Sequence, residues 1–391
     1  MEAAVNDEPR ITKVETFKFT VELRNMGTDR NGFNLVYVPG NTAQVTQYAI
    51  VVQTSTGING EFLGGIPESY AQLEVFAEYL IGKNPLHREQ IYNDVKRALR
   101  KNDRLGFGPV DIALWDFAGK YRGSPVYELL GGAPHPLPAY ASTYHGDRNG
   151  GLDSPQAFAD FAVQCKEMGY PAFKIHPWGD PDIPQEIENV LAVREAVGDT
   201  MDLMLDPACE YETWADTLAV GRALDEARYF WYEDPFKDGG VSAFAHRKLR
   251  ELLRTPLLLT EHVRGLEQHV DFIVAGGTDF VRVDAYYDGG LTGAIKICHA
   301  AEGFGLDAEI HAPGPAHRHL MASIRNTNFY ELGLLNPKAT DNFDICYLDY
   351  SDAIDAVDQN GCVHVPDGPG LGVQLNWDYI LKNRTGGRVW E

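Results

Sequence analysis

The chain has 391 residues, 44% of them hydrophobic and 23% charged, which is the composition of a globular protein rather than a disordered one. Its formal net charge of −22 would repel a nucleic-acid backbone, and no basic stripe offsets it, so we expect no nucleic-acid partner. No apolar run is long enough to span a membrane, and the acidic start, MEAAVNDEPR, lacks the apolar core of a secretory signal. These features predict a cytoplasmic protein with no membrane partner.

The acidic excess has two compatible interpretations. A solvated acidic surface aids solubility, and a few of the carboxylates could also hold a cation. The cysteines are dispersed and form no CxxC pair, so we expect reduced and mostly structural thiols at Cys165, Cys209, Cys298, Cys346 and Cys362. Nothing beside Cys209 indicates the activating base of a nucleophile.

Residues 1–136 predict an α+β unit. Two β-like runs at 11–23 and 47–57 flank a polar stretch at 24–34, rich in glycine and asparagine, that we interpret as a loop. Helical patterns follow at 67–82, 88–101 and 109–123. The loop-like tail at 366–391 is expected to return to this unit and complete it as a capping domain.

Residues 137–365 follow a different pattern, in which eight short apolar runs alternate with amphipathic, helix-like segments. Several of these segments open with serine or proline and close on glycine, as capped helices do. Eight strands that each precede a helix or a helix-like turn fit a parallel barrel better than an open sheet. The fold class predicted here is therefore α/β, with a barrel as the second domain.

The candidate functional residues lie at the ends of these apolar runs. Each run ends on or near a titratable residue: His145, Lys174 with His176, Asp206, Glu233, Glu261, Asp284, His311 and Glu331. In a (β/α) barrel the carboxyl ends of the strands open at one mouth, where catalytic groups gather. Each residue alone could be a surface charge or a helix cap. Packing does not explain the whole set, because a buried unpaired charge is costly.

Asp206, Glu233 and Glu261 end three consecutive strands. Three carboxylates brought together would raise each other's pKa unless a cation neutralised them. Oxygen ligands of this kind suit Mg²⁺, and no cysteine or histidine pattern indicates zinc. We therefore predict a magnesium site whose remaining coordination positions take the carboxylate of a small-molecule substrate.

The remaining residues are candidates for acid–base chemistry. Asp284 and His311 end adjacent strands, and the carboxylate would fix the tautomer of the histidine and raise its basicity, although a structural histidine is the alternative. Lys174 and His176 face the same side of one strand, where the lysine can polarise a substrate carboxylate. One of these two could be merely structural. Glu331 could donate a hydrogen bond if protonated, or balance the charges of His311 and the metal.

In this order, these residues resemble the enolase superfamily, specifically its mandelate racemase subgroup. The resemblance covers nearly the whole chain and includes the segments DIALWDFAGKYRGSPVYELLGG, LMLDPA, WYEDPF, LLTEH, VRVDAYYDGGLTG, EIHAPG and DGPGLGV. It implies a homo-oligomer with a (β/α)7β-type modified TIM barrel and an α+β capping domain. It also implies that the metal is bound by Asp206, Glu233 and Glu261, and that the dyad of this subgroup is Asp284 with His311.

The second strand departs from the family pattern. Many relatives have Lys-x-Lys there, and this chain has Lys174-Ile175-His176, so His176 takes the position of the second lysine. The resemblance further implies that Glu331 contacts the substrate carboxylate. A histidine on the seventh strand argues against the muconate-lactonizing branch, which carries a lysine on the sixth.

The predicted activity is the magnesium-dependent dehydration of an acid sugar, an aldonate or an aldarate. The substrate carboxylate would bind the metal and Lys174, a histidine would take the α-proton to give an ene-diolate, and protonated His311 would expel the β-hydroxyl, leaving a 2-keto-3-deoxy acid. His311 is slightly favoured as both base and acid. The candidate substrate-binding residues are His145, His262 and, from the capping loop, Arg24 or Arg30.

Two alternatives stay open. A racemase or epimerase would use His176 and His311 on opposite faces of the substrate. A non-catalytic barrel would bind an acid without turnover. Separately, Arg282 and Glu309 are predicted to point inward on neighbouring strands and to pair with one another, because an unpaired charge would be costly there.

Overall fold

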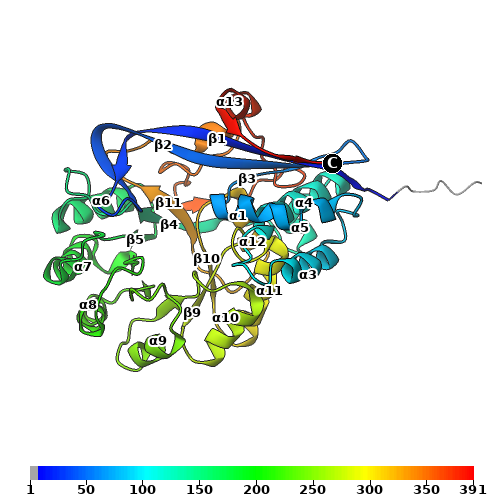
Figure 1. Cartoon of the computed structure of the whole chain (residues 1–391). Coiled ribbons are helices and arrows are strands. Elements are labelled where there is room, and N and C mark those ends of the chain that lie inside the picture. The colour runs from blue at the N-terminus through cyan, green and yellow to red at the C-terminus, as the bar shows by residue number, and fades with distance from the viewer. Residues whose placement is uncertain (1–7) are drawn as a thin grey trace, which may run out of the picture.

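The computed structural model describes residues 8–391, which form an antiparallel sheet with helices and a parallel barrel (Figure 1). The sheet is built on a long hairpin of β1 (Ile11–Thr28) and β2 (Leu35–Thr54), and β3 (Gly60–Leu63) pairs with β2. The short strands β13 (Arg384–Gly386) and β14 (Val389–Trp390) pair with β1, so the two ends of the described chain share one sheet.

The first part of the stretch 24–34, as far as Thr28, is strand, so the prediction of a loop over its whole length is wrong. Pairing between β1 and β2 continues as far as Thr28, which lies opposite Leu35. Only residues 29–34 are left to connect the two strands. Long-range pairing with β2 therefore overrides the local preference of glycine and asparagine for a turn.

The helices that follow the sheet lie against one side of the barrel (Figure 1). They are α1 (Pro67–Gln72), α2 (Ala77–Leu80), α3 (Arg88–Ala98), α4 (Phe107–Arg122) and α5 (Val126–Leu129), with the 3₁₀ turn η1 (Leu73–Val75) between the first two. The single helix expected at 67–82 is therefore broken. No helix among residues 8–391 is long and apolar enough to cross a membrane.

Eight parallel strands form a nearly closed barrel, which confirms the predicted fold class. In chain order they are β4 (Leu137–Thr143), β5 (Ala172–Ile175), β6 (Asp202–Leu205), β7 (Trp231–Glu233), β8 (Leu257–Leu259), β9 (Phe280–Val283), β10 (Ala308–Ile310) and β11 (Tyr330–Leu335). Neighbours in sequence are neighbours in the sheet up to β10, and β11 closes the ring against β4. This connectivity turns all the strand ends toward one mouth.

Helices surround the barrel on its outer side (Figure 1). They are α6 (Pro155–Glu167), α7 (Ile183–Val197), α8 (Trp214–Ala227), α9 (Ala243–Arg250), α10 (Gly265–Val274), α11 (Gly290–Gly303) and α12 (Pro315–Met321). Several begin at the expected caps; at α6, for example, the Ser154 side chain accepts a hydrogen bond from the backbone of Ala157. The 3₁₀ turns η2 (Gly198–Thr200) and η3 (Asp344–Cys346), β12 (Cys362–Val363) and α13 (Trp377–Lys382) complete the described elements.

The sequence predicts that Glu331 ends the last strand, and this prediction is wrong. The residue is the second of β11, and Leu332, Gly333 and Leu335 continue the ladder with β4 beyond it. Glu331 is in register with Tyr140 on β4. Its carboxylate therefore lies inside the barrel rather than at the mouth.

Helix α4 fixes the capping elements to the strand end that carries Asp284. A side-chain carbon at Gly108 would lie only 2.0 Å from the carbonyl oxygen of Tyr286. Nearby, the Asp111 carboxylate accepts hydrogen bonds from the backbone and the hydroxyl of Thr292 on α11, at 2.9 and 2.7 Å. The glycine permits this close approach, so the position of α4 is coupled to the loop after β9.

We expect Gly108→Ala to lower the free energy of unfolding by about 1–3 kcal/mol, because the added methyl group forces α4 away from the 285–286 backbone. Gly303→Ala in α11 is a matched control, because a side-chain carbon there meets nothing within 4 Å. Denaturant unfolding of both variants measures the effect. Equal stability in the two variants would contradict the close packing of α4.

Candidate active site

The structure brings the three predicted metal-binding carboxylates together. Each of Asp206, Glu233 and Glu261 offers an oxygen within 4.8 Å of the oxygens of the other two. Glu233 ends β7, Asp206 directly follows β6, and Glu261 lies two residues after β8. The first two are buried, and a cluster of buried oxygen donors without thiol or imidazole fits the ligand preference of Mg²⁺.

Two buried cations contact this cluster from inside the barrel. The Lys174 ammonium lies 3.3 Å from Asp206, 3.0 Å from Glu233 and 2.9 Å from Glu331. The Arg282 guanidinium lies 2.8 Å from Glu233 and 2.7 Å from Glu331. Although burial lowers the pKa of Lys174, the carboxylates raise it well above its usual value, so the lysine stays charged.

Glu331 is held as a carboxylate anion. Besides the two cations it accepts hydrogen bonds from the Ser142 hydroxyl at 3.0 Å and from the Ala312 backbone at 2.8 Å. Burial raises the pKa of Glu331, but Lys174 and Arg282 bring it well below its ordinary value. Of the two roles predicted for this residue, these contacts favour charge balance over proton donation, and the charges that it balances are those of the two cations.

The predicted ion pair between Arg282 and Glu309 is not formed, and that prediction is wrong. The two residues are in register on β9 and β10, as expected. Arg282 pairs with Glu233 and Glu331 instead, and Glu309 accepts a hydrogen bond from the Asn328 amide at 2.5 Å. Arg282 thus belongs to the candidate site. Its only signal in the sequence was a charged residue at an inward-facing position.

The structure brings the two residues of the predicted dyad into contact. Nδ1 of His311 lies 2.6 Å from the Asp284 carboxylate, and Nε2 lies 3.4 Å from the nearest oxygen of Glu261. Burial lowers the pKa of His311, but the Glu261 and Asp284 carboxylates outweigh it and raise the value to about 9. With Nδ1 held by Asp284, Nε2 faces Glu261, one of the predicted magnesium ligands.

His176 contacts Asp206, one of the three predicted metal-binding carboxylates. Its Nδ1 lies 2.7 Å from the carbonyl oxygen of Thr143, and its Nε2 lies 3.0 Å from Asp206. His145 lies beside it, with ring centroids 5.1 Å apart. Burial and the neighbouring His176 lower the pKa of His145 to about 4, so this ring is neutral at neutral pH and can both donate and accept hydrogen bonds.

The other candidate substrate-binding residues are less closely associated with the site. His262 lies at the mouth, 4.0 Å from Glu261, with about a third of its side chain exposed. Arg24 is exposed on β1, and its guanidinium pairs with Asp341 at 2.9 Å. Arg30 lines a separate hollow with Asp29 and Arg148.

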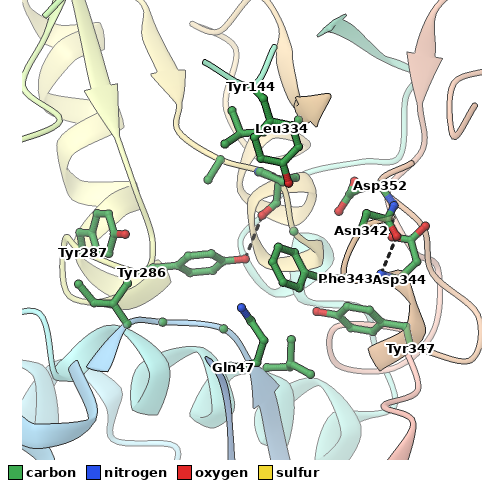
Figure 2. Close-up of a pocket in the computed structure, with 18 residues that line it drawn as sticks. Gln47, Tyr144, Tyr286, Tyr287, Leu334, Asn342, Phe343, Asp344, Tyr347 and Asp352 are labelled. Carbon is green, nitrogen blue, oxygen red and sulfur yellow. Dashed lines mark hydrogen bonds between the residues drawn. The ribbon is translucent and has the colours of Figure 1, made fainter. Parts of the chain in front are cut away.

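A cavity of about 270 Å³ lies between the antiparallel sheet and the barrel (Figure 2). Gln47 points into it from β2, and Tyr286 and Phe343 approach from opposite sides (Figure 2). Tyr287, which also lines it, has its ring centroid 6.0 Å from that of His311. The cavity is therefore separated from His311 by the Tyr287 ring, one of its lining side chains.

The sequence did not indicate three further residues that support the site. Ser142 donates to Glu331, and the Tyr140 hydroxyl accepts a hydrogen bond from Arg282 at 3.0 Å. His317 lies with Nε2 3.2 Å from the second oxygen of Asp284. Ser142 and Tyr140 lie within a strand, and His317 is the third residue of α12, so none stood at a predicted strand end.

We expect Mg²⁺ to bind more tightly at pH 9 than at pH 7. A proton on His311 and a cation on Glu261 repel one another, so metal binding lowers the histidine pKa from about 9, and protons compete with the metal below that pH. Isothermal titration calorimetry at the two pH values measures the effect. In His311→Asn the difference should shrink, and an undiminished pH dependence in that variant would contradict this coupling.

Comparison with known proteins gives the family. Residues 34–131 match the N-terminal domain of mandelate racemase/muconate lactonizing enzymes, and residues 157–379 match the enolase C-terminal domain-like family. The chain is 33% identical to a D-glucarate dehydratase from Agrobacterium tumefaciens, solved in complex with magnesium. That superposition has a TM-score of 0.86 and covers 96% of this chain and 99% of the other.

Two relatives in sequence carry related activities. A D-gluconate dehydratase from Thermoproteus tenax is 28% identical over 71% of this chain, and an L-talarate/galactarate dehydratase from Salmonella typhimurium is 29% identical over 65%. These matches span 55% and 63% of the relatives' own lengths. On the two family matches and the shared architecture, the chain belongs to the mandelate racemase/muconate lactonizing enzyme family of the enolase superfamily.

Proposed function

We propose that this protein is a Mg²⁺-dependent dehydratase of an acid sugar, an aldonate or an aldarate. The observation that carries the proposal is the position of His311, whose Nδ1 is held by Asp284 while Nε2 faces the metal-binding carboxylates. The names of three similar proteins support it, because they denote dehydratases of gluconate, of talarate/galactarate and of glucarate. The cavity between the sheet and the barrel offers space for a polyhydroxy chain.

The carboxylate end of the substrate would be fixed first. Asp206, Glu233 and Glu261 would hold Mg²⁺, which when bound would ligate the substrate carboxylate and stabilise the negative charge that develops as the α-proton leaves. Lys174 would donate a charge-assisted hydrogen bond to the same carboxylate. The lysine ammonium contacts Asp206, Glu233 and Glu331, so it would exchange one of these contacts for the substrate carboxylate.

His311 would then serve as both base and acid. It would take the α-proton at Nε2, and Asp284 would stabilise the imidazolium that forms. The same proton would pass to the leaving β-hydroxyl, so that water departs and the resulting enol tautomerises to a 2-keto-3-deoxy acid. One histidine suffices for this sequence, because the proton that it removes is the one that the leaving group needs.

Racemisation would require a second base on the opposite face of the substrate, and His176 is the candidate. Its two ring nitrogens are engaged by the Thr143 carbonyl and by Asp206. A base for the α-carbon would need one of them to be free. These contacts favour the dehydratase, with His176 orienting a metal ligand.

A screen of aldonates and aldarates with Mg²⁺, scored by the absorbance of the 2-keto acid semicarbazone, tests the proposal. We expect one acid sugar to be dehydrated, and Asp206→Asn and His311→Asn to lower kcat by roughly a hundredfold or more. Deuterium exchange at the α-carbon without keto-acid formation would replace the dehydratase with a racemase or epimerase. Tight binding of an acid without exchange would indicate a non-catalytic barrel.

His176→Gln separates the two roles of the second-strand histidine. If His176 orients Asp206, the variant should bind Mg²⁺ on the order of tenfold or more weakly and recover most of its kcat at saturating metal. Titration of activity with Mg²⁺ measures both quantities. A large loss of kcat that saturating Mg²⁺ does not restore would make His176 a base.

A further inference from the structure

We propose that the protein has a second cation site, formed by Cys209, Asp234 and His262, which prefers a thiolate-binding transition metal such as Zn²⁺ to Mg²⁺. One ligand atom from each of these side chains lies within 4.8 Å of the ligand atoms of the other two. Each residue follows one of the three predicted magnesium ligands by one to three positions in the chain. The second site therefore lies beside the first, at the same barrel mouth.

Asp234 is a buried carboxylate without a hydrogen-bond donor in the part of the chain that the structure describes. The residue is 2% exposed, and among the described residues neither of its carboxylate oxygens has a hydrogen-bond partner. The nearest basic group is Nε2 of His262, at 3.5 Å. A buried carboxylate without donors is costly.

The first site does not include Asp234, so Mg²⁺ bound there would neutralise the neighbouring carboxylates without giving Asp234 a partner of its own. Consecutive residues at a strand end project in different directions, so Glu233 turns toward Lys174 and Arg282 while Asp234 turns toward His262. Neither Lys174 nor Arg282 lies within ion-pair distance of Asp234 in the described chain. Among the described residues, His262 is therefore the one basic group within ion-pair distance of Asp234.

The geometry admits such a cation. Cys209 is partly exposed and His262 has about a third of its side chain exposed, so an ion can enter from the mouth. Gly240, at φ +69°, brings the 237–240 loop close to the cluster, because a side-chain carbon there would lie 2.5 Å from Asp234 and 2.8 Å from His262. The cluster is thus enclosed on one side and open on the other.

The donor set determines the metal. A thiolate, a carboxylate and an imidazole are the ligands of Zn²⁺ and Co²⁺, whereas Mg²⁺ takes oxygen donors. Burial and the nearby Asp234 raise the pKa of the Cys209 thiol, so the thiol is protonated in the free protein. Metal binding would release this proton and leave the thiolate bonded to the metal.

Titration with Co²⁺ in the presence of saturating Mg²⁺ tests the site without any assay of catalysis. We expect a thiolate-to-cobalt charge-transfer band in the near ultraviolet, lost in Cys209→Ser and retained in Cys362→Ser. Cys362 is a matched control, because it is a partly exposed thiol outside the cluster. His262→Gln should weaken Co²⁺ binding on the order of tenfold or more, and this variant keeps the thiol.

Three outcomes would overturn the proposal. The first is the absence of a charge-transfer band in the unmodified protein, which would leave an Asp234–His262 ion pair as the explanation of the buried carboxylate. The second is a band that persists in Cys209→Ser. The third is a band that Asp206→Asn abolishes in a folded protein, because the cobalt would then occupy the magnesium site.

Discussion

The candidate site depends on two buried cations that neutralise carboxylates from within the barrel. Lys174 and Arg282 both contact Glu233 and Glu331, and the Tyr140 hydroxyl accepts a further hydrogen bond from the arginine. Burying these ions is costly unless each is paired and hydrogen-bonded, so removing one partner would leave an uncompensated charge. The network thus fixes Glu233, and with it the position of the predicted magnesium ligands, before any metal binds.

The antiparallel sheet and its helices turn an open barrel mouth into a cavity. Gln47 and residues 64–66 supply one wall, and residues 312–314 supply the other. Helix α4 fixes the position of one wall relative to the other, because Gly108 packs directly on the backbone that follows Asp284. The predicted acid–base residues therefore come from the barrel, whereas Gln47 and residues 64–66 of the cavity wall come from the N-terminal part of the chain.

The sequence predicted the barrel and the residues at its mouth because both follow from short-range patterns. Eight apolar runs with polar ends predict parallel strands, and their order alone places Asp284 beside His311. The partner of Arg282 could not be predicted in the same way, because a long side chain can reach across the barrel to a strand that is not its neighbour. The sequence predicted Glu331 at the end of its strand because the residues that follow, among them Gly333, do not by themselves predict a strand.

The pairing of β13 and β14 with β1 makes the first strand of the chain dependent on the last. During synthesis the barrel strands emerge before these two, so one edge of the sheet has no partner until residues 384–390 have been made. An unpaired strand edge can associate with other chains. The growing chain must keep this edge from aggregating while the whole barrel is being translated.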